Sequence, residues 1–199
     1  MSGERQHAKG QEGAQRAKRW LEATTRVNVL WVNPEPMALP KLTFRWLTGG
    51  TFSFDLAGVL VGGNQANEEF FAECKKYDNA YDQGQLYDEY LAKCYVALNF
   101  QPSRCDHFMW ITWSPFATTR WDSLCRSASV QAAVLKNSER ALGVPIEEAS
   151  SKIDSDVCDT VASRLWIIVL SERQEEHLVL SPEHQGLIRA HVAERAAKG

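Results

Sequence analysis

Two acidic residues and a lysine occupy polar positions in two neighbouring segments whose residues alternate as in β-strands. Asp55 lies in segment 52–56, and Glu73 and Lys75 lie two residues apart in the apolar segment 70–76. Because successive side chains of a strand point to opposite faces, Glu73 and Lys75 share one face of the sheet. Pairing of the two segments across the intervening turn would then bring Asp55 beside Glu73.

Two carboxylates and an ammonium group at this spacing are suited to phosphodiester hydrolysis with a metal ion. Carboxylates held close together repel each other, and a hard cation such as Mg²⁺, which prefers oxygen ligands, relieves that repulsion. The cation can polarise a phosphoryl oxygen and lower the pKa of a bound water, while Lys75 orients that water or helps to deprotonate it. The sequence therefore predicts Mg²⁺ or Mn²⁺ at Asp55 and Glu73. The alternative for the same residues is a solvated sheet face with a surface ion pair.

The surrounding elements predict an α/β fold with a mixed central sheet flanked by helices, in a single domain over residues 1–199. Helical spacing of apolar residues indicates helices at about 10–24 and 83–98. The segments 107–116 and 165–170 are apolar on both faces, which is typical of buried strands, the first of them placed by a parallel crossover. Further strands are expected at 27–31, 42–46, 52–56 and 70–76, and further helices over 119–142 and from Pro182 onward.

The segment FDLAGVLVGGNQANEEFFAECKKY, residues 54–77, resembles the PD-(D/E)xK nuclease superfamily, also called restriction-endonuclease-like. Asp55 matches the first acidic position of that family, and Glu73-Cys74-Lys75 matches its ExK motif. Phe54 stands where many members have proline. The resemblance implies a restriction-endonuclease-like core and a nuclease activity.

Further site residues are implied by the same resemblance. Gln83 and Tyr87 match the QxxxY element of RecB-like members, and four residues apart on a helix they share a face that is predicted to line the site. Helix surface or core packing is the alternative for this pair. In members related to Holliday-junction resolvases and Mrr-type enzymes a Glu of the first helix adds a metal ligand, and Glu12 is its counterpart here. The family also implies metal contact from the backbone carbonyl of Cys74, whose side chain is expected in the core.

The resulting hypothesis is a Mg²⁺-dependent DNA endonuclease with a catalytic core at about 10–116, completed by residues 117–199. Asp55, Glu73, Lys75, Gln83 and Tyr87 are its predicted catalytic residues, with Asp55, Glu73, the Cys74 carbonyl and Glu12 as metal ligands. One alternative is a non-catalytic subunit of the same fold that binds DNA or another protein in a larger defence or repair complex. An RNA-cutting enzyme of similar fold is another. Many relatives act as homodimers, so a homodimer is also predicted.

The composition limits the class of protein and its location. The 199 residues are 44% hydrophobic and 24% charged, as in soluble globular proteins. No apolar run approaches the roughly 20 residues that cross a bilayer, and the start of the chain has no hydrophobic signal region, so no membrane partner is expected. The five cysteines form no CxxC pair, which favours a reducing cytoplasm. The net charge of −3 counts against nucleic-acid binding, although basic residues crowd the first helix.

Overall fold

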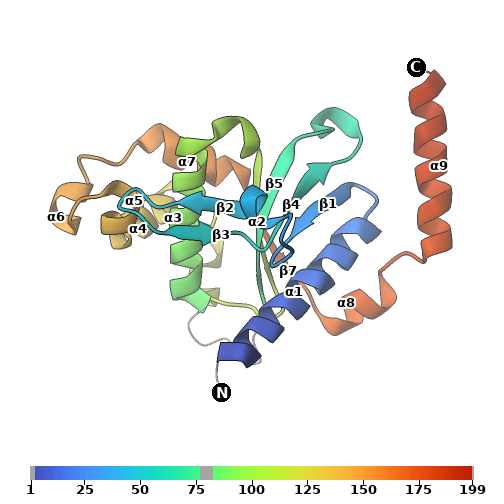
Figure 1. The fold of residues 1–199 in the computed structure, drawn as a ribbon, viewed down its shortest axis with the longest axis horizontal. Coiled ribbons are helices and arrows are strands. Elements are labelled where there is room, and N and C mark those ends of the chain that lie inside the picture. Colours follow the sequence, from blue (N-terminus) through green and yellow to red (C-terminus); the bar gives the residue numbers. More distant parts are fainter. Residues whose placement is uncertain (1–2, 77–82, 199) are drawn as a thin grey trace.

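A mixed β-sheet forms the centre of the protein. Within the residues that the computed structural model describes, 3–76 and 83–198, five strands lie in the order β1-β4-β5-β6-β7 (Figure 1). β1, β4 and β5 pair antiparallel, whereas β5, β6 and β7 run parallel. These strands are β1 (Val27–Val32), β4 (Leu56–Leu60), β5 (Glu69–Lys75), β6 (His107–Thr112) and β7 (Leu165–Val169). The predicted α/β fold with a mixed central sheet is confirmed at this level.

Helices cover both faces of this sheet (Figure 1). The longer ones are α1 (Gly3–Ala23), α3 (Gln83–Phe100), α4 (Ser127–Lys136), α7 (Ser155–Arg164) and α9 (Pro182–Lys198). On one face, Ala17 and Leu21 of α1 share a core with Phe70 of β5. On the other face, α3, α4 and α7 share a core with Phe71 and Trp110. Burial from both sides explains why every residue of β6 is buried.

Short helices connect the longer elements. They are α2 (Leu39–Leu42), α5 (Ser138–Leu142), α6 (Ile146–Ala149) and α8 (Glu172–His177), with the 3₁₀ turns η1 (Gly63–Gln65), η2 (Pro102–Arg104) and η3 (Thr118–Ser123). The helical region predicted over 119–142 is therefore divided among η3, α4 and α5. The final helix predicted from Pro182 is confirmed as α9, which stands away from the body of the molecule (Figure 1). No helix among the described residues is long and apolar enough to cross a bilayer.

The chain around Asp55 differs from the single strand expected at 52–56. β2 (Thr43–Arg45) and β3 (Thr51–Ser53) form a separate two-stranded hairpin, and the main sheet begins again at β4. The backbone N–H of Phe54 donates to the Leu42 carbonyl, whereas the next N–H, that of Asp55, donates to the Ala72 carbonyl of β5. Asp55 is thus the residue at which the backbone leaves the hairpin and joins the main sheet.

β7 also differs from the buried strand predicted at 165–170. It is the edge strand beside β6, its residues are half-buried or exposed, and the Trp166 side chain is 41% exposed. A continuous apolar run predicts burial without distinguishing a central strand from an edge strand. Only the tertiary arrangement leaves this strand at the edge.

Gly58 marks the close approach of β4 and β1. A Cβ added at Gly58 would lie 2.1 Å from the carbonyl oxygen of Asn28 and 2.9 Å from the Phe70 ring. We predict that Gly58→Ala lowers the free energy of unfolding by about 2 kcal/mol or more, because the β1 backbone must shift. Urea denaturation measures this change, with Gly84→Ala as a control whose Cβ meets open space. An unchanged free energy for Gly58→Ala would contradict the close packing of the two strands.

Candidate functional site

Asp55, Glu73 and Lys75 come together where β4 and β5 pair. The antiparallel register places Asp55 beside Glu73. The backbone N–H of Cys74 donates a hydrogen bond to Asp55 Oδ2 at 2.7 Å, and Lys75 Nζ lies 2.7 Å from Glu73 Oε1. The predicted alternation along β5 is confirmed, because Glu73 and Lys75 form an ion pair while the Cys74 side chain is buried in the core.

A fourth charged residue, Lys93 of α3, completes this group. Lys93 Nζ lies 3.3 Å from Glu73 Oε1, the oxygen that Lys75 also contacts. Sequence reasoning missed Lys93, although a signal was present, since it is the single charge in the apolar run from residue 90 to residue 98. A lysine in the buried stripe of a helix is directed toward the sheet. Asp55, Glu73, Lys75 and Lys93 are called the carboxylate–lysine cluster below.

Burial and charge set the protonation of this cluster. Burial, and then repulsion from Glu73, raise the pKa of Asp55 to about 7, against the opposing effects of Lys75, Lys93 and the Cys74 N–H. Burial also disfavours the ionised form of Glu73, but the ammonium groups of Lys75 and Lys93 outweigh it and lower the pKa of Glu73. Near neutral pH, Glu73 is therefore ionised while Asp55 is protonated in part of the molecules.

Gln83 and Tyr87 are both buried in the interior of the protein. The Thr112 hydroxyl donates to Gln83 Oε1 at 3.0 Å, and the Tyr87 hydroxyl donates to the Leu124 carbonyl at 3.0 Å. Both side chains are buried, and burial raises the pKa of the Tyr87 hydroxyl well above its usual value. These contacts are compatible with core packing of the pair, and the catalytic role of Gln83 and Tyr87 stays a prediction.

Glu12 lies on α1 and is 54% exposed. Its carboxylate pairs with Lys76, the residue after Lys75, and with Arg16 one helical turn away. The hydrogen bond and charge of Lys76 lower the pKa of Glu12. The structure thus brings Glu12 near the end of β5, where it pairs with Lys76 and Arg16.

The carboxylate–lysine cluster offers two carboxylates to a metal ion. Among the described residues, no group of three or more His, Cys, Asp or Glu side chains is arranged to hold a metal ion. One oxygen of Glu73 already contacts two ammonium groups, while its Oε2 is buried without a hydrogen-bond partner in the described part of the chain. Mg²⁺ or Mn²⁺ at Asp55, Glu73 and the Cys74 carbonyl stays a prediction, in which Glu73 Oε2 would be the first ligand.

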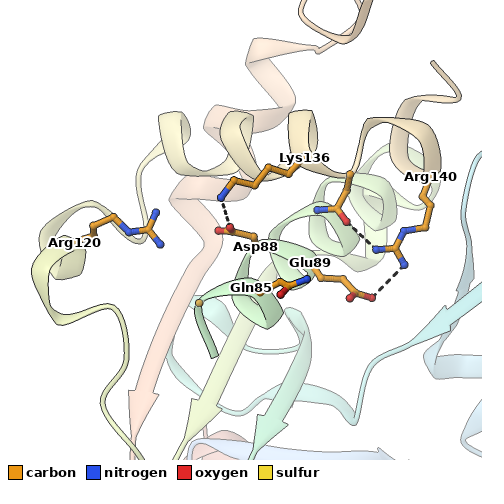
Figure 2. Close-up of a pocket in the computed structure, with 8 residues that line it drawn as sticks. Gln85, Asp88, Glu89, Arg120, Lys136 and Arg140 are labelled. Atoms are coloured by element: carbon orange, nitrogen blue, oxygen red, sulfur yellow. Dashed lines mark hydrogen bonds and ion pairs between the residues drawn. The ribbon is translucent and has the colours of Figure 1, made fainter. Parts of the chain in front are cut away.

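A separate cavity of about 500 Å³ opens at the exposed face of α3, between its first turns, η3, α4 and α5 (Figure 2). It is called the cationic pocket below. The described residues that line it are Gly84, Gln85, Asp88, Glu89, Arg120, Lys136, Asn137 and Arg140. No residue of the carboxylate–lysine cluster is among them. Sequence reasoning assigned none of these residues to a site, because they come from helices that only the fold brings together.

Three cations and two carboxylates face one another in the cationic pocket. Lys136 Nζ lies 2.5 Å from Asp88 Oδ2, and Arg140 Nη1 lies 3.5 Å from Glu89 Oε1. Arg120 makes no ion pair with any residue that the structure describes, and it stands at the opposite end of the row from Arg140 in Figure 2. The formal charges of these five side chains, +3 and −2, leave a local charge of +1.

Comparison with known proteins gives a distant likeness to two solved structures. No protein-family model matches the chain, and no curated protein sequence matches it. A Cap4 SAVED/CARF-domain containing receptor of Moraxella osloensis is 8% identical with a TM-score of 0.41, covering 86% of this chain and 35% of that one. The Acinetobacter baumannii Cap4 SAVED/CARF-domain containing receptor, solved with the cyclic trinucleotide 2′3′3′-cAAA, is 11% identical with a TM-score of 0.42, covering 86% and 33%. The chain spans about a third of the length of these proteins.

These comparisons contradict the nuclease hypothesis. The two solved structures are SAVED/CARF-domain containing receptors and not PD-(D/E)xK nucleases, which contradicts both the assignment to that superfamily and the predicted Mg²⁺-dependent deoxyribonuclease. The finer restriction-endonuclease-like core is not confirmed. The physical reason is that Asp followed by ExK on paired strands also forms a self-neutralised ion-pair cluster, in which Lys75 and Lys93 hold Glu73.

Protonation of Asp55 predicts how stability depends on pH. Its raised pKa means that the native state binds a proton that the unfolded chain has already released, between the ordinary aspartate value of 3.8 and about 7. The contribution of Asp55 to the free energy of unfolding therefore decreases as pH rises through that window and is constant above it. We predict that Asp55→Asn reduces the change in the free energy of unfolding between about pH 5 and about pH 8. Urea denaturation at the two pH values measures this change.

Asp159→Asn is the matched control for this measurement, because Asp159 is exposed on α7. The free energy of unfolding of the control should change between the two pH values as it does in the unaltered protein. If Asp55→Asn shows the same pH dependence of the free energy of unfolding as the control, Asp55 is ionised in the native state over this whole pH range.

The prediction of a cation at Asp55 and Glu73 has its own test. A divalent ion that binds there must displace the Asp55 proton, because both cannot occupy the carboxylate. We expect Mn²⁺ binding, measured by calorimetry in two buffers of different ionisation enthalpy near pH 6, to release protons, and Glu73→Gln to abolish the binding. Mn²⁺ binding that Glu73→Gln leaves unchanged would place the ion elsewhere, and absence of binding would remove the prediction.

Proposed function

We propose that this chain is a non-catalytic domain that binds a small phosphate-bearing ligand in the cationic pocket. The observation that carries the proposal is the convergence of Arg120, Lys136 and Arg140 on one cavity of about 500 Å³. Ligand sites are concave and typically occupy roughly 300–1,000 Å³. A cavity of this size that gathers positive charge, on a chain whose net charge is −3, favours an anion.

The two arginines supply the chemistry that phosphate recognition needs. A guanidinium group offers several N–H donors in a planar fork that matches two phosphate oxygens, and it keeps its charge at every physiological pH. Arg120 has its guanidinium available for such a contact, since no described carboxylate pairs with it. Lys136 adds a point charge from the neighbouring helix α4.

The carboxylates of the cationic pocket support a ligand with hydroxyl or amino groups beside its phosphates. Asp88 and Glu89 orient Lys136 and Arg140. A carboxylate has several lone pairs, so each can also accept a hydrogen bond from a sugar hydroxyl. A phosphorylated sugar compound satisfies both kinds of group, whereas inorganic phosphate satisfies only the cations.

DNA is the second candidate ligand because it presents the same phosphodiester groups. A duplex is usually bound by an extended basic face that neutralises several phosphates. The net charge of −3 and the limited extent of the cationic pocket favour the small ligand. The cytoplasm is part of the proposal, since all five cysteines are free thiols.

Substitution of Arg120 tests the proposal. We predict that Arg120→Gln weakens binding of a short phosphorylated ligand by about tenfold, because a charge-assisted hydrogen bond is lost. The cyclic trinucleotide 2′3′3′-cAAA is a suitable first probe, measured by calorimetry at low salt beside a short DNA duplex. Arg45→Gln, which alters an exposed arginine of β2 outside the cationic pocket, is the matched control and should bind normally.

A blocking variant gives an independent measurement. A Cβ at Gly84 meets no atom within 4 Å, so Gly84→Glu should fold normally while it adds a negative charge to the cationic pocket. We expect Gly84→Glu to weaken binding of the trinucleotide at least as much as Arg120→Gln does. Binding that neither variant changes, or no binding of any phosphorylated compound, would refute the proposed function. Tighter binding of the duplex, with equal sensitivity to Arg120→Gln, would favour DNA.

A further inference from the structure

We infer that the ligand of the cationic pocket carries a nucleobase, and that Trp121 is the side chain on which the base stacks. This inference rests on the proposed function, because the place of the base is argued from a phosphate held at Arg120. It adds a recognition element outside the residues that line the cationic pocket, and it narrows the ligand from phosphorylated compounds in general to nucleotides and oligonucleotides.

The position of Trp121 is set by the aromatic core. Trp121 lies on η3, and its ring meets the ring of Phe116 at 6.4 Å and 74°, an edge contact. Phe116 is buried and packs in turn against Tyr87 of α3, with ring centroids 5.2 Å apart. One edge of Trp121 is thus held by the core while 43% of the residue remains exposed. The indole is therefore preorganised and still has surface to offer.

Trp121 does not line the cationic pocket, but two connections lead from it to residues that do. Tyr87, on which Phe116 packs, is adjacent on α3 to Asp88 and one helical turn from Gly84, and both of these line the cationic pocket. Trp121 also directly follows Arg120, whose side chain lines it as well. Arg120 and Trp121 therefore present a cation and an aromatic surface from one short turn, beside the first turns of α3.

This pair of side chains fits one chemical class of ligand. In a nucleotide, a flat base and an anionic phosphate are joined by a sugar, so the base can stack on Trp121 while a phosphate contacts Arg120. Stacking on an aromatic side chain tolerates any base because every base has a π-face. An exposed tryptophan is by itself unremarkable on a protein surface. Its ring contact with the aromatic core and its place directly after Arg120 are what assign it this function.

The test compares two ligands that both present several phosphate charges, only one of which carries bases. Binding of the cyclic trinucleotide and of inorganic tripolyphosphate is measured for the full chain and for Trp121→Ala. We expect Trp121→Ala to weaken binding of the trinucleotide by about tenfold and Trp121→Phe to weaken it less. The affinity for tripolyphosphate should stay unchanged in Trp121→Ala. Trinucleotide binding should also quench tryptophan fluorescence, and that quenching should disappear in Trp121→Phe. Trp166→Phe, at a tryptophan 41% exposed on β7, is the matched control.

Each outcome separates this inference from the proposed function. If both ligands bind and Trp121→Ala changes neither affinity, stacking is refuted while the cationic pocket stands. An equal loss for both ligands would also refute stacking, because the substitution would then act on the fold of η3. If neither ligand binds the unaltered chain, the proposed function fails and the inference fails with it.

Discussion

The burial of one carboxylate under two ammonium groups is the constraint on which the rest of the structure depends. Glu73 is only 4% exposed, and an unpaired charge at that depth would cost several kcal/mol of solvation. Lys75 reaches it from the same strand, but Lys93 reaches it only because α3 lies across β5. The ion pairs therefore restrict the position of α3 on the sheet, in addition to the packing of its apolar stripe.

The position of α3 in turn creates the cationic pocket. With its buried face on the sheet, the helix turns Asp88 and Glu89 toward α4 and α5, where Lys136 and Arg140 pair with them. The buried Tyr87 on the same helix supports Phe116, which holds the edge of Trp121. One helix thus connects the buried cluster, the aromatic core and the surface at which a ligand is proposed.

The two charged sites differ in the kind of ligand they suit. In the carboxylate–lysine cluster two acids and two lysines compensate one another, and the raised pKa of Asp55 lets a proton replace an external cation. In the cationic pocket positive charge is in excess by one, and Arg120 has no described acidic partner. An anion therefore gains more at the cationic pocket, although the cluster has the more familiar sequence pattern.

The sequence by itself determined the alternation that places Glu73 and Lys75 on one face of β5, because a two-residue period is a property of any extended strand. It also determined the helices from residues 10 and 83, whose apolar residues repeat at helical spacing. It failed where side chains from distant segments meet. Lys93 looked like an ordinary helix residue. The sequence also shows no motif that joins Arg120, Lys136 and Arg140, which come together only because η3, α4 and α5 meet at α3. Only the tertiary structure decided these contacts, because charge compensation and cavities depend on distances in space, which a short sequence pattern does not contain.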